Sequence, residues 1–324
     1  MGNICHTVQF QIMQLITRPM NHINKLSHII NGKKFNKKTA LEKLNCRIPD
    51  GCVYGLIGAN GAGKSTFMRL IAGVYRPDGG TVTLDGAPIY NNPQAKNQLL
   101  FVPDDLYFLP QANMQRMADF YRAFYPAFST ERFASLTEAF GLNPKANLNS
   151  FSKGMRRQAA IILALSAMPR YILFDETFDG LDPVMRSLVK RVIYSDVEER
   201  GVTAVISSHS LRELEVTCDQ LALLHQGGIV FESEVQSLQT ALFKIQIAFS
   251  HEFDEKAVFH GIQVLEITRS GSVANAIVRG EREQVRAALA ALSPVLLEIL
   301  PLSLEEVFVY ETEALGYRFG DLLQ

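Results

Sequence analysis

Short apolar runs alternate with turns and helical stretches along the first two thirds of the chain. Runs of strand length are typical of strands buried in a sheet, and they occupy residues 28–30, 41–48, 53–57, 81–84, 99–102, 171–174 and 202–206. Residues 221–224 and 228–231, joined around Gln226-Gly227, predict a hairpin. Apolar residues at helical spacing predict helices at 66–72, within 112–143, at 153–168 and at 183–199. Alternating strands and helices indicate an α/β fold with a parallel sheet.

The pattern changes beyond about residue 236. Apolar runs predict strands at 243–249, 264–268, 274–278 and 295–300, and helical spacing predicts helices at 281–292 and 304–313. We therefore expect a small α+β domain over 236–324, with no catalytic constellation of its own. Residues 1–24 match no pattern; a short amphipathic helix and an unstructured extension both remain open.

One loop carries the strongest chemical signal. It reads G-x-x-x-x-G-K-S and comprises Gly58, Ala59, Asn60, Gly61, Ala62, Gly63, Lys64, Ser65 and Thr66, between a predicted strand and a predicted helix. Its glycines let backbone amides approach a phosphate at a helix N-terminus, where the dipole favours an anion. Lys64 would reach the outer phosphates and Ser65 would bind Mg²⁺. The alternative is a plain glycine-rich turn, but the lysine and hydroxyls in register favour a nucleotide site.

A second polar cluster follows two other apolar runs. Asp175 and Glu176 end the run at 171–174, and Ser207-Ser208-His209 follow 202–206. In a parallel sheet, ligands lie beyond the carboxyl ends of the strands. Adjacent acids are common on surfaces, but here they would serve a phosphate loop: Asp175 would hold Mg²⁺ through water and Glu176 would polarise the attacking water.

Composition excludes several classes of protein. The chain has 324 residues, of which 47% are hydrophobic and 20% charged, enough for a large core and too few charges for a disordered chain. A formal net charge of −1 supplies no overall field for nucleic acid or anionic lipid.

Cysteine spacing and apolar run length bear on location. Cys5, Cys46, Cys52 and Cys218 lack zinc-type spacing, so we expect reduced thiols of a cytosolic protein, mostly in the core. The longest apolar run, 159–165, is far shorter than the roughly 20 residues that span a bilayer. Gln9, Gln11 and Gln14 interrupt the first apolar residues, so we expect no signal peptide.

Further motifs resemble those of ABC-type ATPases. Phe151-Ser-Lys-Gly-Met-Arg-Arg-Gln158 is similar to their signature motif, and Thr177-Phe-Asp-Gly-Leu-Asp-Pro183 to their D-loop. His209 falls at the switch histidine and Phe35 at the aromatic that stacks on adenine. The resemblance covers about 25–235. It implies a P-loop NTPase with a RecA-like parallel sheet core, an antiparallel β subdomain and a helical subdomain at about 104–168.

The resemblance also implies a composite site. ATP with Mg²⁺ would lie between the phosphate loop of one subunit and Ser152 and Gly154 of a second, with Asp182 along the dimer interface. His209 would contact the γ-phosphate. Asp104 stands where the family usually has a glutamine that contacts Mg²⁺ and water, and we expect its carboxylate to face Mg²⁺ there. Lys153 and Met155 also depart from the usual signature.

The function implied is that of the ATP-binding and hydrolysing subunit of a transporter, exporter type, with the permease as a separate chain. Leu302-Ser-Leu-Glu-Glu-Val-Phe308 is similar to the close of such subunits. A homodimer or a related heterodimer would sit on the inner face of the membrane, with Asp104 to Leu109 receiving the permease and no nucleic acid bound. A soluble ribosome- or DNA-linked ATPase is the alternative, and a non-hydrolysing regulatory binder is a third possibility.

Overall fold

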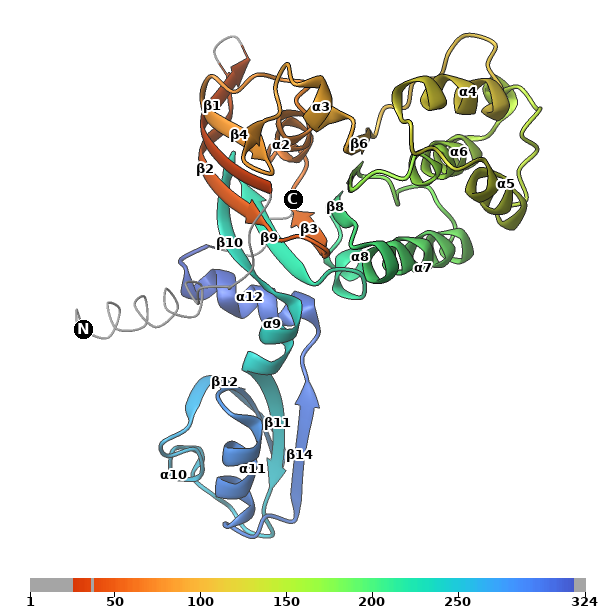
Figure 1. Ribbon diagram of the computed structural model, residues 1–324. Coiled ribbons are helices and arrows are strands. Elements are labelled where there is room, and N and C mark those ends of the chain that lie inside the picture. Colours follow the sequence, from red (N-terminus) through yellow and green to blue (C-terminus); the bar gives the residue numbers. More distant parts are fainter. Residues whose placement is uncertain (1–25, 36–37, 318–324) are drawn as a thin grey trace. The chain divides into compact units, whose positions relative to one another are not determined.

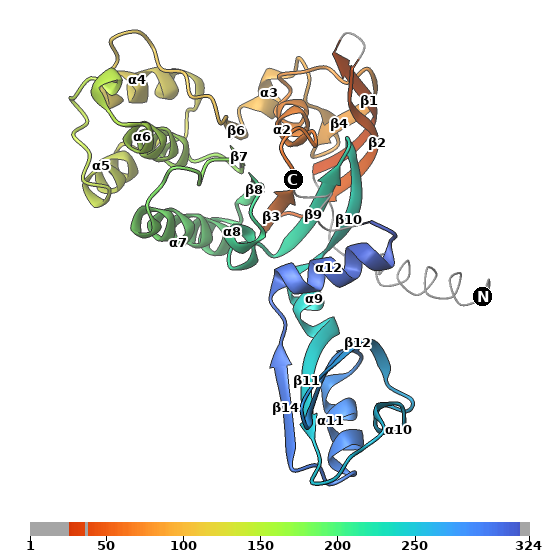
Figure 2. The same ribbon diagram turned by 180° about the vertical axis from the view of Figure 1, so that it is seen from behind.

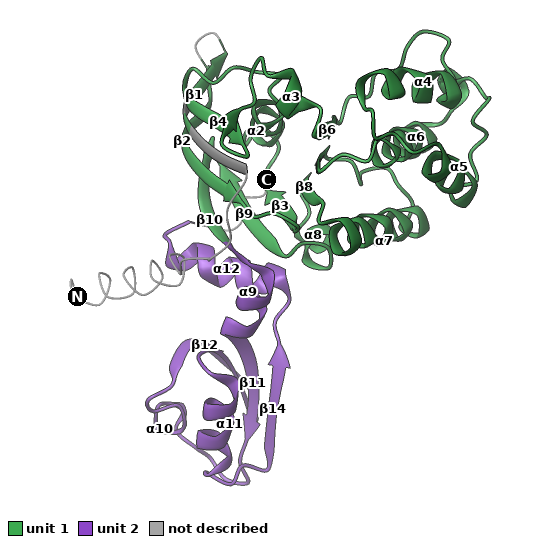
Figure 3. Cartoon of the chain, viewed as in Figure 1, with its two compact units in different colours: residues 1–232 green, residues 233–324 purple. Residues whose placement is uncertain are grey.

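The computed structural model describes residues 26–35 and 38–317, and Figure 1 labels their elements. The chain forms two compact units, one up to Glu232 and the other from Ser233 on (Figure 3). The extension predicted at 1–24 and Cys5 lie outside the described residues. The roles predicted for the domains 25–235 and 236–324 stay predictions.

A six-stranded sheet forms the centre of the first unit. Its strand order is β10-β9-β3-β8-β7-β6, and every neighbouring pair from β9 to β6 is parallel. The strands are β3 (Val53–Ile57), β6 (Leu99–Val102), β7 (Tyr171–Asp175), β8 (Thr203–Ser208), β9 (Gln220–His225) and β10 (Gly228–Glu234). β3, β7 and β8 are buried along their whole length, which explains why their sequences are apolar throughout. The predicted α/β fold is confirmed.

A second, antiparallel sheet flanks the helix that follows β3. Its order is β2-β1-β4-β5, from β1 (Leu26–Phe35), β2 (Lys38–Ile48), β4 (Gly79–Leu84) and β5 (Ala87–Pro88), and α3 (Pro93–Lys96) follows. Helix α2 (Lys64–Ile71) contacts β2 and β4 on one side and β7 on the other (Figure 1 and Figure 2). Phe67, Met68 and Leu70 are fully buried in the shared core. This packing fixes where the N-terminus of α2 points.

Between β6 and β7 the chain is helical. The stretch predicted as helical over 112–143 forms α4 (Met114–Phe124) and α5 (Thr130–Ala139), because Ser129 caps a new helix by accepting from the Arg132 amide. A short turn, η1 (Leu148–Ser150), precedes α6 (Lys153–Ser166). Ser152 caps α6 and its residues 157–166 are all buried. After β7 come α7 (Pro183–Arg200) and, after β8, α8 (Leu211–Glu215).

The second unit is a β-α-β-β-α-β arrangement. It contains α9 (Val235–Ala241), β11 (Leu242–Ala248), α10 (Glu255–Val258), β12 (Gln263–Ser270), β13 (Val273–Arg279), α11 (Arg282–Ala290), β14 (Leu296–Pro301) and α12 (Leu304–Ala314). The order β12-β13-β11-β14 with antiparallel neighbours is the ferredoxin-like topology. Alternate residues of β11 (Phe243, Ile245 and Ile247) face its core. None of the helices in the described part of the chain is long and apolar enough to cross a membrane.

Candidate functional site

The phosphate-type loop runs from β3 into α2, and its backbone tolerates no side chain at two positions. A Cβ at Gly58 would lie 2.4 Å from the Leu224 carbonyl oxygen. Gly63 has a φ of +114°, and a Cβ there would lie 2.8 Å from the Ala40 oxygen. The loop can therefore follow this path only with glycine at both positions.

Lys64 and Ser65, the first residues of α2, link the loop to the end of β7. The buried Lys64 ammonium donates to the Gly58 carbonyl at 2.6 Å and lies 3.0 Å from Glu176 Oε1. Ser65 Oγ donates to Asp175 Oδ1 at 3.1 Å. The helix start and the two adjacent acids, far apart in sequence, therefore meet at one edge of the sheet.

Asp175 is fully buried and only partly satisfied. Its Oδ1 accepts from Ser65 and from Ser207 Oγ, the latter at 2.7 Å, but its Oδ2 has no partner among the residues that the structure describes. Burial raises the pKa of Asp175, while the two hydroxyl donors partly oppose this. A buried, unpartnered carboxylate oxygen beside a serine hydroxyl offers the hard oxygen ligands that Mg²⁺ prefers. The residues present therefore fit this ion.

Glu176 stands between Lys64 and His209. Its backbone has a φ of +48°, in the left-handed region, and its amide donates to the Ser207 carbonyl at 3.2 Å. His209 Nδ1 lies 3.0 Å from Glu176 Oε2 and 3.8 Å from Asp179 Oδ2. Burial and the nearby Glu176 carboxylate raise the pKa of Asp179. The carboxylate of Glu176 is thus held from both sides.

The signature-like segment starts α6 next to the D-loop-like segment. Ser152 Oγ accepts from the Met155 amide at 3.2 Å, and a Cβ on Gly154 would lie 3.0 Å from the Gly180 carbonyl oxygen. Asp182 uses its carboxylate to cap α7, accepting from the amides of Val184 and Met185. These two motifs pack against each other within one chain.

Phe35 lies at the end of β1. The residue is 41% exposed; its ring packs edge-on against Tyr75, with 5.2 Å between the ring centres, and Lys33 Nζ lies 5.4 Å from the centre of the Phe35 ring. An exposed aromatic face of this kind can stack on a base.

Asp104 follows β6, and its partner is one that the sequence did not indicate. The Arg157 guanidinium of α6 donates to the Asp104 carboxylate, and also to the carbonyls of Glu176 and Asp179. In the described part of the chain, Asp104 has no hydrogen bond to Ser65 or Asp175. Arg157 shares the apolar face of α6 with Ile161 and Ala164, so a lone arginine at that spacing was the available signal.

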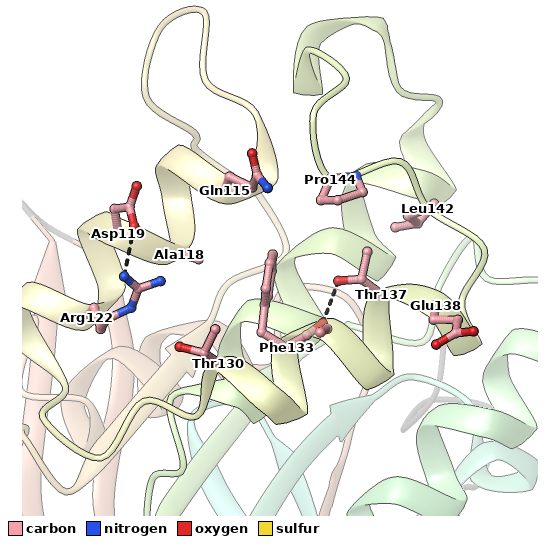
Figure 4. A pocket seen from close by; sticks show the side chains of 11 residues that line it. Gln115, Ala118, Asp119, Arg122, Thr130, Phe133, Thr137, Glu138, Leu142 and Pro144 are labelled. Carbon is pink, nitrogen blue, oxygen red and sulfur yellow. Dashed lines mark hydrogen bonds and ion pairs between the residues drawn. The ribbon is translucent and has the colours of Figure 1, made fainter.

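A pocket of about 530 Å³ lies apart from these residues, between α4 and α5 (Figure 4). Phe133, Leu142 and Pro144 give it an apolar side, and Asp119 pairs with Arg122 at 3.0 Å at its edge. None of the described residues that line it belongs to the predicted site.

A phosphate loop at a helix N-terminus, a buried aspartate beside its serine and a glutamate at the same sheet edge define the class: a P-loop ATPase. The sequence profile of the ABC transporter family matches residues 41–179. The chain is 28% identical over 290 residues to the ABC transporter ATP-binding protein YtrB of Bacillus subtilis, covering 90% of this chain and 97% of that protein. It is 31% identical over 223 residues to the lantibiotic transport ATP-binding protein SrtF of Streptococcus pyogenes, covering 67% and 95%.

The fold is also similar to that of solved ATP-binding cassettes. The dimeric ATP-binding cassette MJ0796, solved in a post-hydrolysis state with ADP and phosphate, matches 65% of this chain and 98% of its own, with a TM-score of 0.58 and 21% identity. The chain belongs to the ABC transporter family and is an ATP-binding, ATP-hydrolysing subunit.

Proposed function

We propose that one ATP lies between the phosphate loop of one subunit and the start of α6 of a second. The observation that supports this most is the meeting of Lys64, Ser65, Asp175, Glu176 and His209 at one sheet edge, with Ser152 and Gly154 at a different helix start. Ser152 Oγ accepts from the Met155 amide, and a hydroxyl that accepts can still donate its own proton to a γ-phosphate oxygen. Phe35 stacks on the adenine, and Asp182 runs along the interface.

Each residue of the loop side has a distinct task. Lys64 neutralises the outer phosphates, and Glu176 accepts a proton from the attacking water, which it orients with His209. Ser65 Oγ would bind Mg²⁺, and Asp175, whose Oδ2 has no partner among the described residues, would hold the ion through water. The ion would supply positive charge beside the phosphates. Asp104 has its carboxylate on Arg157, so we assign it no metal ligand role of its own.

The subunit powers transport through a separate transmembrane permease, and we assign export as the direction. The tail segment 302–308, which runs from directly after β14 into α12, supports this by its similarity to exporter subunits, and SrtF is named for lantibiotic transport. The loop after Asp104 carries exposed Tyr107 and half-buried Phe108, which suit an apolar helix of the permease. The dimer thereby sits on the inner face of the membrane. The relatives lend no support to a ribosome- or DNA-linked role.

The test is Glu176→Gln, which keeps the size and polarity of the side chain and removes its basicity. We expect ATP binding at parent affinity, hydrolysis lowered at least about 100-fold and a dimer trapped by ATP, measured by single-turnover hydrolysis and light scattering. Glu138→Gln, an exposed glutamate on α5, is the matched control. Hydrolysis by Glu176→Gln at the parent rate would remove Glu176 from the reaction.

A further inference from the structure

One guanidinium connects two loops at the edge of the site, those that follow β6 and β7. Arg157 is 2% exposed, and its Nη1 donates to the carbonyl of Glu176 and, at 2.7 Å, to that of Asp179. Its Nη2 donates to the carbonyl oxygen of Asp104 at 3.2 Å and to the Asp104 carboxylate. The guanidinium fork is planar and rigid, so these four acceptors fix one another's positions.

Arg157 contacts Glu176 at a residue whose backbone is constrained. The Glu176 backbone lies in the left-handed region, which residues other than glycine and asparagine adopt at a cost in free energy. Ser207 accepts from its amide, and Arg157 donates to its carbonyl. Both ends of the residue are held, so its carboxylate is directed at Lys64 and His209.

Asp104 is the only carboxylate that pairs with Arg157 within the described residues, and the two ends of the pair differ in exposure. The arginine is buried, whereas the aspartate side chain is 56% exposed. Removing the partner of a buried charge is costly, because the charge then remains without compensation. A displacement of the loop that carries Asp104 would therefore act directly on Arg157.

We infer that Arg157 is a positioning residue for Glu176, and that Asp104 uses the ion pair to link the loop after β6 to the hydrolytic step. The inference rests on the proposed role of Glu176. Neither residue touches the nucleotide. Arg157 acts through two backbone carbonyls, and Asp104 acts through Arg157. The loop after β6 is thus coupled to ATP hydrolysis through the Asp104–Arg157 ion pair and not through direct contact with Mg²⁺.

The experiment compares Asp104→Ala, Asp104→Asn and Arg157→Lys in the full-length subunit, alone and with its permease. Asp104→Ala should lower kcat about tenfold while the KM for ATP and the Kd for nucleotide stay within about twofold, because Lys64 and Ser65 are untouched. Asp104→Asn keeps an acceptor oxygen and should recover part of this loss. Arg157→Lys cannot span all four acceptors and should cost about 100-fold in kcat. The exposed neighbour Asp105→Asn is the matched control for the subunit measured alone, where it should behave like the parent.

The outcomes separate two failures. A parent kcat in Asp104→Ala, or equal losses in kcat and ATP affinity, overturns the inference even when Glu176→Gln is inactive. Parent activity in Glu176→Gln overturns the proposed role of Glu176 instead. Should Arg157→Lys fail to fold, as shown by its unfolding midpoint, the kcat-against-KM split of the two Asp104 variants decides alone.

Discussion

The two units use their sheets in different ways. In the first unit the carboxyl ends of parallel β3, β7 and β8 lie at one edge, and residues at and just beyond these ends form the polar cluster around Asp175. In the second unit neighbouring strands run in opposite directions, so their ends alternate between the two edges, and the helices and sheet enclose an apolar core around Phe243 and Ile247. A parallel sheet brings the loops that follow its strands to one edge, and binding and catalytic residues are often found on such loops. The units should therefore respond differently to substitution: the first in activity, the second in stability.

Lys64→Ala is expected to have the largest effect and tests the first half of the comparison. Loss of the ammonium removes two or more charge-assisted hydrogen bonds to phosphates, so ATP affinity should fall about 1,000-fold, or about 4 kcal/mol. Isothermal titration with ATP gives the affinity. Lys96→Ala is the control, since Lys96 Nζ donates to a carbonyl, that of Gly73, away from the site. Nearly parent affinity in Lys64→Ala would contradict a phosphate role for the loop lysine.

Ile245→Ala tests the second half. Ile245 is fully buried at the centre of β11, and truncation should cost the second unit about 3 kcal/mol of unfolding free energy, with ATP affinity unchanged. Denaturant unfolding combined with amide exchange over residues 242–301 measures the loss. Lys244→Ala, on the opposite face of the same strand, is the control and should cost less than about 1 kcal/mol. A fall in ATP affinity in Ile245→Ala alone would show that the second unit takes part in binding.

Local signals explain which elements the sequence could predict. Helix α7 agrees with its predicted range because Asp182 caps it, Pro183 starts it and Gly201, in the left-handed region, ends it. Strand β6 also agrees with its predicted range, 99–102. The region predicted as helical within 112–143 contains two helices, and the pattern did not locate the break between Phe124 and Thr130, where Ser129 begins the second helix.

Tertiary contacts explain what the sequence could not predict. Asp104 and Arg157 are 53 positions apart, and no periodicity encodes which acid a buried arginine will meet. The sequence predicted Asp104 at the metal and did not single out Arg157. The identities at the phosphate loop were predictable because one contiguous motif contains them, whereas the loop-to-helix ion pair depends on how α6 packs beside β6.

Glu232→Gln probes a partly buried carboxyl group of the first unit that lies away from the nucleotide-site residues. Tyr54 Oη donates to Glu232 Oε1 at 2.6 Å, and burial raises the pKa of Glu232 above its ordinary value near 4.5. The folded state thus holds this proton more tightly than the unfolded state. The resulting stability is present below pH of about 4.5 and is lost as pH rises through the raised folded-state pKa.

The amide in Glu232→Gln does not titrate and still offers an oxygen to Tyr54. The stability of the variant relative to the parent should therefore increase as the pH rises from about 4 to about 8. Urea unfolding across this range provides the measurement, with the exposed Glu234→Gln as control. A difference that stays constant with pH would mean that the folded-state pKa of Glu232 is not raised.

The smallest expected effect comes from the cap of α12. Ser303 Oγ accepts from the Glu306 amide at 3.3 Å, and the Glu306 carboxylate accepts from the Ser303 amide at 2.8 Å, a reciprocal capping box. Ser303→Ala should cost about 1 kcal/mol, and Ser303→Asp, which restores an acceptor, should recover most of it. Thermal unfolding and ATP hydrolysis are measured together. A loss of stability with a parent kcat is the expected result, since the second unit should affect stability and not activity. A kcat that falls in Ser303→Ala and returns in Ser303→Asp would show that the end of the second unit influences the ATP site. The two units would then no longer differ in the way proposed.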